Sequence, residues 1–200
     1  MKPLQLFIVC NISFFFLLGK QNFFAVNFYN YKNFSPYTLF GTVKTIAARA
    51  GTEDTLTNLA LQFNERMGST SKSFLILFIP VLAVCIAAFF IGKRRYMAEH
   101  LVFATHYFSF VLLYYLAFHF IVEVPFWLLS PHNYSSSFDM STSLINLVLL
   151  SAYFVLAARR FYNLSNLHSI IGGLFIAVVF VCCIYAYRMF LFYKIMQSIL

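Results

Sequence analysis

Three side chains near the middle of the sequence have the chemistry of a functional site: the carboxylate Glu99 and the imidazoles His100 and His106. They occur in an otherwise apolar stretch that directly follows three consecutive cations at residues 93–95. On a helix, Glu99 and His106 are seven residues apart and share a face. Ionisable groups at bilayer depth are costly and often mark metal sites or proton paths. These three residues are therefore the candidates for a catalytic role.

A metal site would need further ligands from a second helix. His168, at the start of the last apolar segment, is the only acidic or histidine side chain that the other segments offer. The conceivable metal set is therefore Glu99, His100, His106 and His168. All four cysteines lie in apolar runs without a CxxC pair, and the adjacent Cys182 and Cys183 would point to different faces of a helix. The cysteines therefore predict neither a disulfide nor a zinc site. We expect no metal and no cofactor.

A simpler interpretation explains the same side chains by the position of this helix at the membrane edge. Glu99 would pair with Arg94 or Arg95 in a partly solvated ion pair. His100 would lie among the lipid headgroups. His106, about two turns deeper, would hydrogen-bond across helices, and the candidate partners are Tyr153, Asn146 and Asn11.

The composition of the chain identifies its solvent. Of 200 residues, 62% are hydrophobic and only 10% are charged, and the mean hydropathy is +0.79. Soluble domains carry about 25% charged residues, and a chain of this length cannot bury so many apolar side chains. The net charge of +8 comes from cations at the ends of apolar runs, where topology signals and headgroup contacts account for them. We expect an integral membrane protein that does not bind nucleic acid.

Five apolar segments predict an all-α, polytopic transmembrane helical bundle that forms a single membrane domain over residues 1–200. The predicted membrane helices cover about residues 3–19, 74–91, 96–122, 143–158 and 167–187. Pro80 predicts a kink in the second of them. Gly172 and Gly173 predict close packing of the fifth.

The loop at residues 20–73 is predicted to be helical rather than irregular. Pro36 and Gly51 have the positions of a helix start and a helix stop. A second helix follows Thr52, and its apolar residues recur at helical spacing in one stripe. That stripe consists of Leu56, Leu59, Ala60 and Phe63.

Cation placement predicts the orientation in the membrane. The short loops at residues 93–95 and 159–160 are basic, whereas residues 123–140 contain neither Lys nor Arg. By the positive-inside rule the basic loops lie in the cytoplasm. We therefore expect a cytoplasmic N-terminus, five crossings, an external loop at residues 20–73 and a C-terminus on the outer side of the membrane. Arg94, Arg95, Arg159 and Arg160 are then placed to contact lipid phosphates or an acidic partner.

Three sequence blocks resemble one family. They are a Pro-Leu-x-Leu-Phe motif at Pro3–Phe7, a Tyr-x-x-Glu-His-Leu-x-Phe-x-x-His block at Tyr96–His106, and an Arg-Arg-x-Tyr block at Arg159–Tyr162. In order and spacing they resemble an uncharacterised bacterial inner-membrane family, domain of unknown function 3667. The resemblance implies a multi-pass inner-membrane protein and supplies no reaction. Many members carry an N-terminal zinc ribbon with paired CxxC motifs, and this sequence contains none, so we expect no ribbon-dependent binding.

Three functions remain open on these residues. The first is a non-enzymatic membrane subunit or scaffold that binds lipid, other membrane proteins or further copies of itself. The second is a transporter or channel component whose polar face comprises Glu99, His106 and Ser109. The third is a membrane-embedded metal-dependent enzyme that uses Glu99, His100 and His106. No soluble-enzyme motif is present, and the sequence favours the first function over an enzyme.

Overall fold

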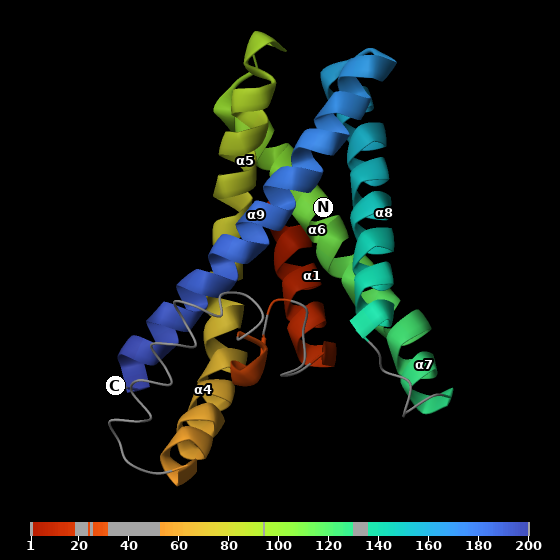
Figure 1. Ribbon diagram of the computed structural model, residues 1–200. Coiled ribbons are helices and arrows are strands. Elements are labelled where there is room, and N and C mark those ends of the chain that lie inside the picture. Colours follow the sequence, from red (N-terminus) through yellow and green to blue (C-terminus); the bar gives the residue numbers. More distant parts are fainter. Residues whose placement is uncertain are drawn as a thin grey trace. The chain divides into compact units, whose positions relative to one another are not determined.

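The computed structural model describes residues 2–18, 24, 26–31, 53–93, 95–129 and 136–199 (Figure 1). Every regular element in this part of the chain is helical. The chain divides into two compact units. Unit 1 comprises Met1–Leu17 and Ile76–Cys183, and unit 2 comprises Leu18–Leu75 and Ile184–Leu200. The helix predicted at residues 36–51 lies outside the described residues.

Seven α-helices make up most of the described part of the chain. The main α-helices are α1 (Pro3–Leu18), α4 (Glu53–Phe74), α5 (Phe78–Phe89), α6 (Met97–Phe118), α7 (Val124–Leu129), α8 (Ser136–Tyr162) and α9 (Asn166–Ile199). Short 3-10 turns are η1 (Phe28–Asn30), η2 (Leu75–Leu77) and η3 (Ile91–Lys93), and η4 (His119–Glu123) is a π-helical turn. The prediction of an all-helical protein is confirmed.

Three described helices are long and apolar enough to cross a membrane: Met97–Phe126, Ser141–Tyr162 and Asn166–Ile199. A fourth candidate arises if Thr57–Ser71 and Leu75–Phe89 are taken together, and α1 is a shorter apolar helix. Between 22% and 33% of the apolar window in each of the three long helices is buried inside the protein. Most of the side chains in these windows are not buried inside the protein, and the three long apolar helices identify a multi-pass membrane protein.

The helix ends differ from the predicted ones. The predicted fifth helix ends at residue 187, whereas α9 continues to Ile199 through Arg188 and Lys194. The predicted fourth helix, 143–158, is extended at both ends to Ser136–Tyr162. The predicted ranges covered only the apolar runs, whereas the helical backbone continues beyond these runs into more polar sequence.

The two interior prolines each follow a change in helix type. The 3-10 turn η2 precedes Pro80, which lies in the first turn of α5, and η4 precedes Pro125; the kink predicted at Pro80 stays a prediction. A proline removes a backbone donor and its ring clashes with the carbonyl four residues earlier, so the preceding turn adjusts. Within the third helix, predicted to end at residue 122, α6 therefore ends at Phe118 and a π turn follows.

In unit 1, α6 is the most buried helix. Its residues Ala104, Phe108, Val111 and Leu112 have no exposed surface. Phe108 contacts two helices, stacking on Phe78 of α5 at 5.3 Å between ring centroids and lying 6.1 Å from Phe7 of α1. On another side, Phe103 of α6 meets Phe154 of α8 edge-to-face at 5.6 Å. Aromatic packing thus places the first turn of α6 among α5 and α8, where the candidate site lies (Figure 1).

The glycine pair of α9 allows close helix packing, as predicted. A Cβ atom on Gly173 would lie 2.4 Å from Val155 Cγ2 and 3.4 Å from the carbonyl oxygen of Ser151, both on α8. A Cβ on Gly172 would lie 3.3 Å from the ring of Phe90. Small residues at such positions let helix backbones approach each other.

Replacement of Gly173 by Ala should separate α9 from α8, because the branched Val155 side chain cannot move away without disturbing its own packing. We expect a loss of about 1–3 kcal/mol of stability, the usual range for overpacking. Gly92→Ala is the matched control, because a Cβ there meets nothing within 4 Å. Thermal unfolding in detergent measures both, and equal melting temperatures for the two variants would contradict the close contact.

Unit 2 has its own aromatic core. Phe63 of α4 is fully buried and contacts Tyr31 at 5.6 Å and Phe192 of α9 at 5.6 Å. Hydrogen bonds tie the same segments, because Tyr31 Oη donates to the Arg188 carbonyl at 3.1 Å and Arg66 Nη1 donates to the Ser198 carbonyl at 2.6 Å. The predicted apolar stripe of α4 is thus buried at Leu59, Ala60 and Phe63, while the side chain of Leu56 lies outside the described residues.

Candidate functional site

The site is centred on a buried pair of polar side chains at the end of unit 1 that carries the two basic loops. His100 projects from the first turn of α6 and is 3% exposed. Its Nδ1 lies 2.8 Å from the hydroxyl oxygen of Tyr162 at the end of α8, and the two rings are stacked at 5.5 Å. A buried polar group without a partner costs about 1–3 kcal/mol, and here each satisfies the other.

The end of α8 determines where Tyr162 points. Asn163 has a φ of 51°, the left-handed conformation that ends helices and that Asn tolerates better than most residues. The backbone N–H of Leu164 then donates to the carbonyl of Arg159 at 3.2 Å, as in a helix C-cap. Tyr162 stays in the last helical turn and stacks on Phe90 at 4.6 Å. Its phenol is thereby directed into the bundle.

A second link joins the same two loops at the surface. Arg95 Nη1 donates to Glu99 Oε2 at 2.7 Å, with side chains 39% and 31% exposed. Its Nη2 donates to the Phe161 carbonyl at 3.4 Å, and its guanidinium carbon lies 5.8 Å from the centre of the Phe161 ring. Partly exposed ion pairs contribute at most about 1 kcal/mol. The ion pair therefore matters less for stability than for placing the Arg95 guanidinium beside the end of α8.

The remaining cations of this end are exposed. Lys93 belongs to η3, and Arg159 and Arg160 are in the last turn of α8. Arg94 lies outside the described residues. Glu99 is the acidic side chain that neutralises part of this charge, through Arg95. The described part of this end therefore carries a net positive charge.

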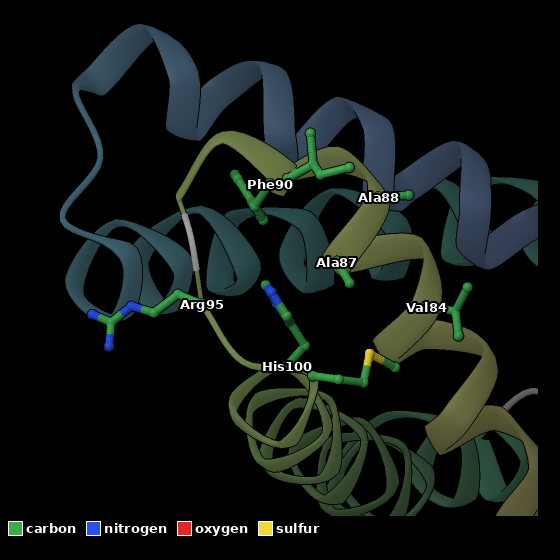
Figure 2. Close-up of a pocket in the computed structure, with 8 residues that line it drawn as sticks. Val84, Ala87, Ala88, Phe90, Arg95 and His100 are labelled. Carbon is green, nitrogen blue, oxygen red and sulfur yellow. The ribbon is translucent and has the colours of Figure 1, made fainter.

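A cavity of ≈ 370 Å³ lies between the end of α5 and the start of α6. Figure 2 shows the His100 ring projecting into the space below Phe90 and Ala87, while the Arg95 guanidinium points away from it. Apart from these two polar residues the lining is apolar: Val84, Ala87, Ala88, Phe90, Ile91 and Met97. Pockets for small ligands have volumes of about 300–1,000 Å³ and combine apolar walls with a few polar groups.

The structure exchanges the expected roles of the two histidines. His100, expected among the headgroups, is buried and hydrogen-bonded across helices, whereas His106, expected to need a buried partner, is exposed on α6. Asn146, a proposed partner of His106, instead accepts a hydrogen bond from Tyr114 at 2.6 Å. His106 lies on the face of α6 that is not packed against other helices. The sequence could not predict this, because periodicity does not identify which face of a helix meets its neighbours. The expected pairing of Glu99 with a cation is confirmed for Arg95.

The conceivable metal set is not brought together. Glu99 pairs with Arg95, His100 with Tyr162, and His168 Nδ1 lies 2.8 Å from the hydroxyl of Ser165 on its own turn. Among the described residues no group of three or more His, Cys, Asp and Glu side chains is placed to hold a metal ion. The prediction of no metal and no cofactor stays a prediction.

Sequence reasoning missed the contribution of Tyr162 and Phe90. Tyr162 was part of the Arg-Arg-x-Tyr block, and the structure joins that block to the block at residues 96–106 through its contact with His100. Neither aromatic residue differs in local sequence from the many other Phe and Tyr side chains of the chain. One sequence signal was present: Asn163 directly follows Tyr162, and Asn often adopts the left-handed conformation that ends a helix, so it indicated that Tyr162 lies in a last helical turn.

No family model, no curated protein and no solved structure matches this chain. The resemblance of its three sequence blocks to domain of unknown function 3667 stays a prediction. The functional argument below is built on the geometry of the site and on its charge.

His100 and His106 provide a matched test, because they are the same residue type on one helix. His100→Leu leaves the buried Tyr162 hydroxyl without its partner, and we expect a loss of about 1–2 kcal/mol in the membrane environment. His106→Leu replaces an exposed imidazole on an apolar face and should be neutral or stabilising. Thermal unfolding in detergent measures both, and a larger loss for His106→Leu would contradict the assigned roles.

Proposed function

We propose that this chain is a non-enzymatic membrane subunit that binds anionic lipid headgroups at its basic end. The observation that carries the proposal is the joining of the two basic loops, through His100–Tyr162 and Arg95–Phe161, into one end of unit 1. The exposed cations on both loops then act on the same small area of membrane surface. Each Lys or Arg near an anionic leaflet contributes about 1 kcal/mol of attraction.

The polar face required by a transporter is divided in this geometry. Glu99 is paired with Arg95, His106 is exposed, and Ser109 is buried with its hydroxyl donating to the Thr105 carbonyl at 2.7 Å. These three side chains have separate surroundings among the described residues. The metal-dependent enzyme requires the same residues together, so the geometry favours lipid binding over both alternatives.

Five crossings are part of the proposal, and unit 2 supports them by parity. Unit 2 contains both α4 and the last turns of α9, which are joined by Arg66–Ser198 and Tyr187–Ser71 hydrogen bonds. We place the contacts of unit 2 outside the hydrocarbon core, so that its two segments share one side of the membrane and the chain between them crosses an even number of times. Three long apolar helices are an odd number, and we propose the apolar run predicted at residues 74–91, which contains η2 and α5, as the fourth crossing.

The fifth crossing is α1. Its 16 residues span about 24 Å at ~1.5 Å per residue, somewhat less than the ~30 Å of a hydrocarbon core. Phe7, Cys10, Phe14 and Phe15 are buried, and Phe7 packs on the mid-helix residue Phe108 of α6. With the basic loops in the cytoplasm, the N-terminus is cytoplasmic and unit 2 is periplasmic, as in a bacterial inner membrane.

The parity argument predicts which positions share a side. In a variant without its native cysteines, single cysteines replace the exposed residues Leu61, Gln197 and Lys93. An impermeant maleimide should label positions 61 and 197 in intact cells and position 93 only after permeabilisation. Labelling of 61 and 197 from opposite sides would refute an even number of crossings.

Lipid binding predicts a preference that depends on Arg159 and Arg160. The purified chain should retain phosphatidylglycerol over phosphatidylcholine of the same acyl composition in native mass spectrometry. The double variant Arg159→Gln/Arg160→Gln should reduce that preference about tenfold or more, because two headgroup contacts of about 1 kcal/mol each are removed. Arg66→Gln, which removes one cation from unit 2, is the control and should leave the preference unchanged. An unaltered preference in the double variant would refute the proposed function.

A further inference from the structure

The cavity between α5 and α6 has the features of a binding site for the apolar part of a ligand. Six of its eight lining residues are apolar: five lie between Val84 and Ile91, on the last turns of α5 and just after it, and the sixth is Met97 at the start of α6. Seven residue steps of helix correspond to a length of about 10 Å along this open cavity. A water-soluble polar ligand would leave its hydrogen-bonding groups unpaired against these walls, at a cost of about 1–3 kcal/mol each. The walls select an aliphatic group.

The two polar lining residues lie where an amphiphile would change from apolar to polar. Arg95 is at the edge, beside the exposed Lys93 and Ile91. His100 projects into the cavity, and its Nδ1 is engaged by Tyr162. When the Tyr162 hydroxyl donates to Nδ1, the ring carries its proton on Nε2 and can donate it to a carbonyl. An ester group next to an acyl chain offers such a carbonyl.

The charge at the cavity edge determines the sign of the headgroup. Glu99 neutralises Arg95 in part, but Lys93, Arg159 and Arg160 are exposed cations of the same two loops. A zwitterionic headgroup would bring a second cation to this basic end, whereas an anionic phosphate complements it.

We propose that this cavity holds the upper part of one acyl chain of an anionic phospholipid, with its ester near His100 and its phosphate at the Lys93–Arg95 edge. This inference rests on the proposed function and deepens it. It distinguishes one lipid bound at a specific site from lipids attracted generally to a basic surface.

The test fills the cavity without changing any charge. Ala87→Trp places a large side chain in the cavity, and Ala152→Trp places the same side chain on an exposed position of α8. Native mass spectrometry of the full chain with phosphatidylglycerol counts the tightly retained lipid. We expect Ala87→Trp to reduce the fraction of lipid-bound protein at least tenfold and Ala152→Trp to leave it unchanged. Ala88→Trp, which fills the same cavity from an exposed position, is the second variant if Ala87→Trp does not fold.

The outcomes separate this inference from the proposed function. If the cavity variants retain phosphatidylglycerol as the natural chain does, the inference is overturned, while the effect of Arg159→Gln/Arg160→Gln still decides headgroup binding. If the natural chain retains a neutral isoprenoid or phosphatidylcholine as tightly as phosphatidylglycerol, the anionic occupant is overturned. The site is supported if Ala87→Trp or Ala88→Trp loses the tightly retained lipid, Ala152→Trp keeps it, and the remaining binding still prefers phosphatidylglycerol over phosphatidylcholine.

Discussion

The hydrogen bond between His100 and Tyr162 is the constraint on which the basic end of unit 1 depends. The His100 imidazole and the Tyr162 hydroxyl are buried among aromatic rings, where water cannot hydrogen-bond to them, so each must be oriented toward the other. That requirement fixes the first turn of α6 against the last turn of α8. The cations that precede and follow these turns are brought together as a result, and the space left beside His100 becomes the cavity.

The helices could be predicted from the sequence because composition and apolar length are local properties. Their ends could not, because they depend on neighbours. Arg188 and Lys194 interrupt an apolar run, yet they are inside α9 because the packing of Phe192 and Ile195 into unit 2 continues the helix past them. The π turn after Phe118 depends on how Pro125 is accommodated, and several local backbone solutions exist for that.

The candidate site was predictable only where its contacts are local. Glu99 is four residues from Arg95, and their closeness in sequence limited the predicted partner of Glu99 to Arg94 or Arg95. The roles of His100 and His106 depend on which face of α6 is covered by other helices, and both faces are apolar in sequence. Tyr162 is separated from His100 by 62 residues, so its partnership required the fold.

Unit 2 also places a condition on the order of synthesis. Tyr31 and Arg66 belong to the early part of the chain, but their partners Arg188 and Ser198 are 157 and 132 residues later. Contacts of such long range form late and slowly. Until α9 has been inserted, Phe63 lacks the ring of Phe192 and this early segment cannot complete its core. The nascent chain thus carries an incomplete core of unit 2 through most of its translation, which is a period of exposure to proteases and to membrane-associated chaperones.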